Sequence, residues 1–245
     1  MAEMKVDIVI PLYNEEKILE KSVNTLVDFL YQSIFPYDYS IILANNASTD
    51  DSLNICNKLS NKYTQVRYLD IGGKGKGLAV RTSWSKSDAD ILVFMDIDLA
   101  SDLNFLRHLV DSVAVDKNDM VIGNRRGPKS KVFSDKITRR FASKVFNFMV
   151  QLILKSPFID HQCGFKAISK EKFNLIAPFL NENGFFIDTE LIIISLAYGL
   201  KIQPIDIIWR DGRNSKVSLF GDSVKMFMGI LRLWWRLKNK LNNKL

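Results

Sequence analysis

The stretch Ile91-Leu92-Val93-Phe94-Met95-Asp96-Ile97-Asp98 decides the fold, because a short apolar run ends directly in two carboxylates. Such a run predicts a strand that is buried on both faces, as in a parallel sheet. Alternate residues of an extended chain point the same way, so Asp96 and Asp98 can face one cation while Ile97 turns into the core. Two hard oxygen ligands suit Mg²⁺ or Mn²⁺ that bridges to a nucleotide diphosphate. The alternative is an Asp-rich turn after a strand.

Strands and helices alternate along the first half of the chain. We expect strands at residues 6–10, 39–44, 66–69, 91–95 and 120–122, and helices at 15–29, 48–59, 72–84 and 103–115. Ser48 is the expected cap of the second helix. This alternation predicts an α/β fold with a mostly parallel, Rossmann-like sheet flanked by helices. Ligands of such sheets bind at the carboxyl ends of the strands, where Asp96 and Asp98 lie.

Length and composition favour one large α/β domain, with 245 residues of which 47% are hydrophobic. The net charge of +7 suits a phosphorylated substrate or an anionic membrane, and no nucleic-acid motif accompanies it, so we expect no nucleic-acid partner. The N-terminus lacks the pattern of a signal peptide, and Cys56 and Cys163 lack the spacing of a metal site. These features predict a cytoplasmic protein with free thiols.

Two segments, about 134–155 and 222–245, have the pattern of broadly apolar helices with a narrow polar or basic stripe. Neither is a long uncharged stretch that would span a bilayer, so we expect both to lie in the membrane interface, with Trp234 and Trp235 at headgroup level. The protein would then be peripheral on the cytoplasmic face of a membrane. Packing on the sheet or on a partner subunit is the alternative, which leaves a homodimer open. Residues 1–221 would form the catalytic domain, followed by a membrane-associating helix.

Polar loops follow the first two strands at the same expected edge of the sheet. The first contains Pro11, Leu12, Tyr13, Asn14 and Glu15, and the second contains Asn45, Asn46, Ser48 and Asp50. Side-chain amides in such loops can read a nucleobase edge, while a helix N-terminus attracts phosphate. The alternative for the second loop is an Asx turn with a helix cap.

The run Gly72-Gly73-Lys74-Gly75-Lys76-Gly77 is typical of a loop that approaches an anion, because its glycines let the backbone come close and its lysines add charge. Arg81 adds a further cation. The run lacks the Gly-Lys-Ser/Thr of a Walker A motif and fits the dinucleotide motif poorly, which disfavours a kinase or a dehydrogenase. A flexible surface loop is the alternative.

These motifs together resemble the family 2 glycosyltransferases of the GT-A fold, in the polyprenyl-phosphate (dolichyl-phosphate) glucosyltransferase branch. The resemblance covers nearly the whole chain and rests on residues 10–15, 47–50, 73–81, 96–100, 123–126, 160–166, 186–190 and 215–217. It implies that the loops after the first two strands hold the nucleoside and that Asp96 and Asp98 hold the metal. Many relatives carry Asp-Asp-Gly-Ser where this chain has Asn45-Asn46-Ala47-Ser48, so UDP is our expectation and GDP stays open.

By this resemblance the enzyme transfers a hexose, glucose in our interpretation, from UDP-glucose to a polyprenyl or dolichyl phosphate with inversion. A phosphate nucleophile is already anionic and needs no strong base. We expect the donor diphosphate near Gly73, Lys74, Lys76, Gly77, Arg81, Asp96 and Ile97. We assign catalytic roles to Asp98, Asp188, Arg125, Arg213 and Lys216, and we place the acceptor phosphate at Arg125, Arg126, Arg139, Arg140, Gln162, Lys166 and Ser215.

Alternatives stay open at several of these positions. Asp188 and Glu190 could instead be first-turn charges of a helix over 189–197, and several of the cations could be solvated surface charges. The rival activities are a glycosyltransferase with a sugar-hydroxyl acceptor, a GDP-mannose-dependent dolichyl-phosphate mannosyltransferase and a nucleotidyltransferase. The rival outside the enzymes is an inactive, membrane-attached scaffold.

Overall fold

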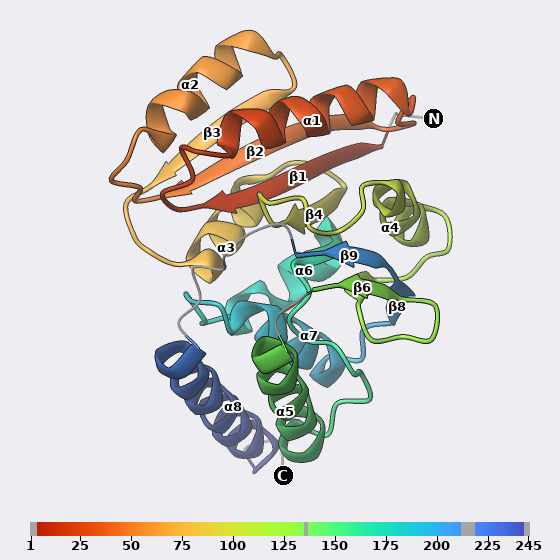
Figure 1. Ribbon diagram of the computed structural model, residues 1–245. Helices are drawn as coiled ribbons and strands as arrows, with labels where there is room; N and C mark the ends of the chain where they lie inside the picture. Colours follow the sequence, from red (N-terminus) through yellow and green to blue (C-terminus); the bar gives the residue numbers. More distant parts are fainter. Residues whose placement is uncertain (1–3, 135–136, 212–218, 243–245) are drawn as a thin grey trace.

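The computed structural model describes residues 4–134, 137–211 and 219–242 (Figure 1). The main sheet contains β1 (Lys5–Leu12), β2 (Asp38–Asn46), β3 (Val66–Ile71), β4 (Ile91–Met95), β5 (Met120–Asn124), β7 (Phe165–Ser169) and β8 (Ile202–Asp206). A small second sheet pairs β6 (Lys131–Phe133) with β9 (Ile208–Arg210). The helices are α1 (Leu19–Gln32), α2 (Ser52–Lys62), α3 (Lys76–Lys86), α4 (Asn104–Ala114), α5 (Ile137–Leu154), α6 (Lys170–Ile176), the 3₁₀ helix η1 (Ala177–Phe179), α7 (Ile187–Ala197) and α8 (Leu219–Asn242).

The main sheet has the strand order β3-β2-β1-β4-β7-β5-β8 and is parallel except for β7. The predicted strand and helix alternation and the mostly parallel sheet are therefore confirmed. β7 runs antiparallel to β4 and β5, and its first residue Phe165 pairs with Met95 at the end of β4. Because of this reversed direction, the start of β7 lies beside the carboxyl end of β4, next to Asp96.

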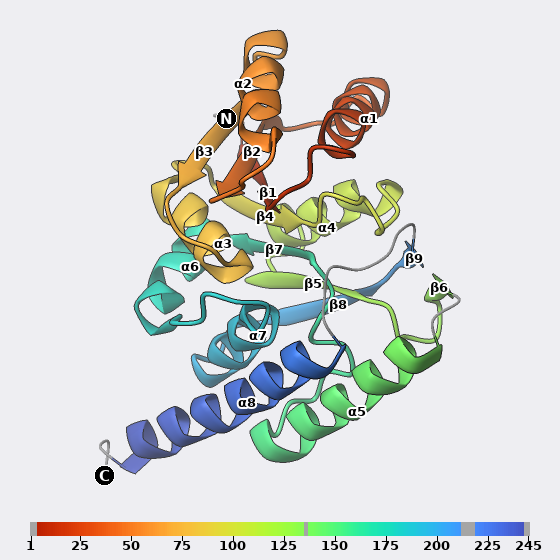
Figure 2. The same cartoon turned by 60° about the vertical axis from the view of Figure 1, so that its left-hand side comes forward.

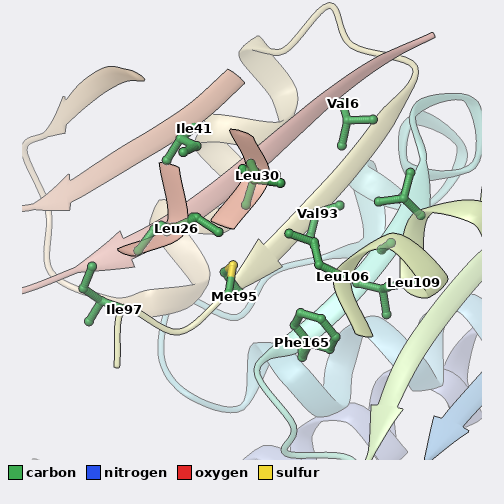
Figure 3. Packing of buried hydrophobic residues seen from close by; sticks show 14 of the residues in the cluster. Val6, Leu26, Leu30, Ile41, Val93, Met95, Ile97, Leu106, Leu109 and Phe165 are labelled. Carbon is green, nitrogen blue, oxygen red and sulfur yellow. The ribbon is translucent and has the colours of Figure 1, made fainter. Parts of the chain in front are cut away.

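β4 is buried on both faces, as its sequence predicts. Val93 and Met95 pack with Leu26 of α1 and Leu106 of α4 in one hydrophobic cluster (Figure 3). The intervening residues, including Phe94, belong to a second cluster with side chains of α3, α5, α6, α7 and α8. Helices therefore cover both faces of the strand that leads into the two carboxylates.

The second helix begins later than the sequence predicts. α2 begins at Ser52, and Ser48 does not cap it. Instead, the hydroxyl oxygen of Ser48 accepts a hydrogen bond from the backbone N–H of Asn14 at 2.9 Å. Asn14 and Ala47 both have positive φ angles (55° and 59°), so the backbone turns sharply before each helix. The polar residues after β1 and β2 therefore form paired loops, and only the later residues become helical.

α5 and α8 lie side by side at one end of the molecule (Figures 1 and 2). One face of each helix is buried in the second cluster, through Phe146 and Val150 of α5 and through Met226, Ile230 and Leu233 of α8. Packing on the sheet domain, which was the alternative to a membrane contact, therefore accounts for one face of each helix. Large apolar side chains remain exposed elsewhere on the two helices: Phe141, Val145, Phe148, Leu152, Val224, Phe227, Met228, Leu231, Trp234 and Trp235. Among the described helices, none has the length and apolar character needed to cross a bilayer.

His161 connects α5 to the segment that precedes β7. Its backbone N–H and its Nδ1 both lie 2.8 Å from the amide oxygen of Asn147, and its Nε2 lies 2.7 Å from the hydroxyl of Ser156. The ring is buried, and this desolvation lowers its pKa to about 4 from the usual 6.5. The imidazole is therefore neutral in the folded protein at neutral pH.

We expect His161 to make the fold sensitive to mild acid. Between pH 6.5 and about 4 the unfolded chain takes up a proton that folded His161 does not, so the stability that this neutral ring supports is lost as the pH falls. The shift corresponds to a loss of about 2 kcal/mol between pH 7 and 5. Urea unfolding at both pH values should show that His161→Gln loses less stability over this interval than the wild type. Equal losses would contradict the assignment.

Candidate functional site

Asp96 and Asp98 line one small hollow at the carboxyl edge of the sheet, together with Gly164 and Trp209. The backbone N–H of Asp96 donates to the carbonyl of Gly164 at 3.1 Å. Asp98 accepts a hydrogen bond from the backbone N–H of Ala100 at 3.3 Å, which steadies the turn after β4. Ile97 is buried in the core, as its place between the carboxylates predicts, and this burial does not support its expected contact with the nucleotide sugar.

Gly164 leaves room for the Asp96 carboxylate. A Cβ at position 164 would lie 2.0 Å from Oδ2 of Asp96, closer than any nonbonded contact allows. A glycine is therefore required here by the close approach of the Asp96 carboxylate. The sequence motif 160–166 contains this glycine, but its spacing from Asp96 gives no sign that the two residues meet.

A continuous chain of opposite charges runs inward from Asp96. The ammonium nitrogen of Lys76 lies 2.8 Å from Asp96 and 3.0 Å from Asp188, and that of Lys166 lies 2.7 Å from the other oxygen of Asp188. Lys166 also donates to the carbonyl of Cys163. Both ammonium groups lie over the ring of Phe94, at 5.0 and 5.4 Å from its centroid.

This pairing fixes the charge state of the buried groups. Burial by itself would raise the pKa of Asp188, but Lys166 and Lys76 outweigh it and hold that pKa below its usual value. Burial likewise would lower the pKa of Lys76, and the carboxylates of Asp188 and Asp96 outweigh it and raise that pKa. Asp188 is therefore ionised, with both oxygens engaged. It lies in the first turn of α7, as the alternative interpretation expected, and it also holds two lysines.

Lys166 does not match its expected role as an acceptor-phosphate contact. Its side chain is 0% exposed, and its ammonium group is bonded to Asp188 and to a backbone carbonyl. A side chain in this position neutralises the interior of the site and does not reach a substrate at the surface.

The loops after β1 and β2 are tied to the glycine-rich loop by Asn46. Its amide nitrogen donates to the carbonyl of Leu12 at 2.8 Å, and its amide oxygen accepts from the backbone N–H of Gly75 at 3.1 Å. Lys74 donates to the hydroxyl of Tyr13 at 2.7 Å across the same space. The three loops that the sequence assigns to the nucleotide sugar therefore lie together.

The other residues expected at the nucleotide have structural contacts. Asn45 is buried and donates to Asp70 at 2.7 Å, and the Asp50 carboxylate accepts from the backbone N–H groups of Ser52 and Glu16. The backbone N–H of Glu15 donates to the hydroxyl of Ser52 at 2.8 Å. Pro11 and Leu12 are the last residues of β1 and are buried. These contacts shape the loops.

The glycine-rich loop packs against residues 181–184. A Cβ on Gly75, whose φ is 143°, would lie 2.1 Å from the carbonyl oxygen of Asn183, and the backbone N–H of Gly77 donates to the carbonyl of Gly184. Arg81 donates to the carbonyl of Leu180 at 2.6 Å and to the side chain of Asn183. Close backbone packing therefore explains Gly75 and Gly77, and Arg81 holds this segment in place. Gly73, by comparison, approaches only the flexible side chain of Leu78.

Arg125 is held by a bidentate pair with buried Asp160, with both nitrogen to oxygen distances at 2.8 Å. Arg126 donates to Ser143, which donates in turn to Gln162. These residues form a polar cluster beside α5, so the structure brings together three of the residues expected at the acceptor phosphate. The exposed Arg140 also lies on α5. The side chain of Arg139 and residues Arg213, Ser215 and Lys216 lie outside the described part of the chain.

The Asp96 and Asp98 carboxylates fit a hard divalent cation that keeps other ligands. Within the described ranges, no three acidic, histidine or cysteine side chains cluster closely enough to hold a metal alone. An ion at the carboxylate pair would therefore complete its shell with water and phosphate oxygens, which is how Mg²⁺ and similar ions are bound beside nucleotides. The Asp96 side chain is 41% exposed and can reach such an ion.

Residues 7–176 match the sequence family described as Glycosyl transferase family 2. The chain belongs to this family. It is 32% identical to glycosyltransferase AglD of Haloferax volcanii over 96% of this chain. The matched region is only 38% of the length of AglD. It is 26% identical to the dolichyl-phosphate beta-glucosyltransferase of Saccharomyces cerevisiae over 99% of this chain and 78% of the yeast protein.

The fold also matches a solved structure. Glucosyl-3-phosphoglycerate synthase from Mycobacterium tuberculosis, in complex with UDP, superposes with a TM-score of 0.69 at 21% identity, covering 95% of this chain and 80% of that protein. At this identity the likeness shows the fold alone, and it confirms the α/β GT-A fold that the sequence predicts.

We expect Asp188→Asn to destabilise the protein by about 3–5 kcal/mol, because it leaves two buried ammonium groups without their shared carboxylate. Urea unfolding at pH 7 measures the change. The control is Glu171→Gln, which removes a carboxylate that is 84% exposed and paired with Lys172, and which should change stability little. Similar effects for the two variants would contradict the structural role of Asp188.

Proposed function

We propose that this glycosyltransferase transfers glucose from UDP-glucose to a dolichyl or other polyprenyl phosphate, with inversion at the anomeric carbon. The observation that carries the proposal is the carboxylate pair Asp96 and Asp98 in a hollow beside the loops of Asn46 and Lys76. The nearly full-length likeness to the yeast dolichyl-phosphate beta-glucosyltransferase supports the lipid phosphate as acceptor.

In this proposal Asp96 and Asp98 hold Mg²⁺ or Mn²⁺. When bound, such an ion neutralises the charge that develops on the departing diphosphate. The mycobacterial synthase has been solved with Mn²⁺ and UDP, which supports this assignment. Lys76 contacts Asp96, and Lys74 of the same loop contacts Tyr13, so both cations would favour an anionic leaving group there.

Asn46 fits a base that carries a ring N–H donor, as uracil does. Its amide nitrogen is occupied by the Leu12 carbonyl, so its amide oxygen faces the opposite way, toward the N–H of Gly75. A carbonyl oxygen can accept a second hydrogen bond. Asn46 can therefore accept from an imide N–H, as the aspartate of many relatives would. Guanine also carries such an N–H, so GDP-mannose is the donor that the assay must separate from UDP-glucose.

The state of Asp188 supports a phosphate acceptor over a sugar hydroxyl. A hydroxyl nucleophile needs a base to take its proton, whereas a phosphate oxygen is already anionic. Asp188 binds a lysine with each oxygen, and its lowered pKa makes it a poor base. Arg126 and Arg140 are the described arginines that we propose for the acceptor phosphate, since Arg125 is committed to Asp160.

The proposal is tested by offering radiolabelled UDP-glucose, UDP-galactose and GDP-mannose with a short polyprenyl phosphate and Mg²⁺ or Mn²⁺. We expect labelled lipid from UDP-glucose, and we expect Asp98→Ala to lower the rate about 10²–10³-fold while leaving the circular dichroism spectrum unchanged. Transfer from GDP-mannose alone, or only to a free sugar hydroxyl, would refute the proposed reaction.

We further propose that the exposed apolar side chains of α5 and α8 lie in the cytoplasmic face of a membrane, where a polyprenyl phosphate presents its headgroup. Trp234 and Trp235 are partly exposed, beside Arg232 and Lys238 on the same helix. Indole rings favour the headgroup level, and basic side chains favour anionic lipid. Both features fit an interfacial helix.

Trp234→Ser/Trp235→Ser should reduce the flotation of the full chain with vesicles of phosphatidylcholine and phosphatidylglycerol. Removing α8 altogether would be a poorer test, because it uncovers the cluster that contains Ile230 and Leu233. Tyr31→Ser/Val115→Ser removes exposed apolar side chains elsewhere and serves as the matched control. Equal flotation of the two variants and the wild type would remove α8 from the membrane contact.

A further inference from the structure

Lys76 occupies a position beside Asp96 that a bound metal ion would also need. Its ammonium nitrogen lies 2.8 Å from Oδ1 of Asp96, one of the two carboxylates proposed to hold the ion. The Lys76 side chain is 12% exposed and the Asp96 side chain 41% exposed, so water screens this contact only from the side of Asp96. A divalent cation on Asp96 would therefore meet a positive charge already bound to the same carboxylate.

Lys76 also has a second partner that would let it leave Asp96. Its nitrogen is 3.0 Å from Oδ2 of Asp188, so it stays paired if the contact with Asp96 breaks. It is the first residue of α3 and follows Gly75, close to the loops that the nucleotide sugar is proposed to occupy. A diphosphate in those loops would supply the negative charge that attracts Lys76 away from Asp96.

We propose that Lys76 takes the place of the metal ion at Asp96. It prevents a divalent cation without nucleotide from binding to Asp96 until a nucleoside diphosphate binds. The diphosphate then takes over Lys76, and Asp96 becomes free for the ion. Metal and nucleotide would thus bind as a unit, each raising the affinity for the other. This inference rests on the proposed metal site and donor, and is independent of which acceptor the enzyme uses.

The neighbouring lysines do not share this role. Lys166 contacts Asp188 and the Cys163 carbonyl, is 0% exposed, and would keep Asp188 neutralised when Lys76 moves. Lys74 lies in the same loop but contacts Tyr13. Lys74→Met is therefore a control that removes a cation from the loop without releasing Asp96.

The test measures Mn²⁺ binding by electron paramagnetic resonance of the free ion, without nucleotide and with saturating UDP, after correction for the Mn²⁺ that UDP holds in a protein-free sample. In the wild type we expect UDP to tighten Mn²⁺ binding at least about fivefold. Lys76→Met should bind Mn²⁺ alone at least about fivefold more tightly than the wild type, and UDP should then raise the affinity by a smaller factor than in the wild type, since only its direct phosphate ligands remain to contribute. Lys74→Met should bind Mn²⁺ alone with wild-type affinity.

The inference would be overturned if Lys76→Met bound Mn²⁺ alone no more tightly than the wild type and if UDP raised that affinity as much as in the wild type. If that variant does not fold, Lys76→Gln takes its place with the same expected results, and Mn²⁺ binding in the wild type that is equally tight with and without UDP also overturns the inference. Mn²⁺ that does not bind even with UDP overturns both this inference and the proposed metal site. A wrong acceptor, in contrast, would show only in the transfer assay and would leave the coupling of Mn²⁺ and UDP unchanged.

Discussion

Asp188 carries a buried negative charge that two lysines neutralise from opposite sides. A buried carboxylate is costly without a partner, so Asp188 needs the charge that Lys166 and Lys76 bring to it. They come from α3, β7 and α7, and Lys76 extends the chain to Asp96 after β4. The requirement for charge balance therefore holds four separate elements in register around the carboxyl edge of the sheet. The position of Asp96 follows from this balance and from the space left by Gly164.

Residues 181–184 connect this edge to the C-terminal helix. The carbonyls of Asn183 and Gly184 accept hydrogen bonds from the start of α3, and Glu182 forms a 2.9 Å ion pair with Arg232 of α8. Glu190 accepts from the backbone N–H groups of residues 181 and 182 and pairs with Arg236 at 2.6 Å. One short segment thus contacts both the glycine-rich loop and the helix proposed to meet the membrane. For this reason α8 is an integral part of the folded enzyme's structure around the site.

The elements were predictable from sequence where one local pattern dominates, as in β4, whose bounds 91–95 are those expected. β7 is not among the strands that the strand and helix alternation predicts, and its residues carry no signal of its reversed direction. The pairing of the charged side chains could not be predicted from the sequence either. Lys76 and Asp188 are far apart in the chain, and the sequence does not show that Lys166, the expected phosphate contact, is buried beside Asp188. The glycine-rich loop was identified, but the segment that requires Gly75 was not, because only the folded chain brings Asn183 beside it.

The wide apolar arcs of α5 and α8 show why composition alone could not decide between core and membrane. A helix that packs on a domain needs one apolar stripe, and a helix that lies in lipid also needs one. In α8, Ile230 and Leu233 supply the first stripe, while Trp234 and Trp235 belong to the side that remains exposed. The sequence shows the sum of two stripes as a single broad arc. A helix of this kind can be fixed to the enzyme by one face and still present the other to lipid.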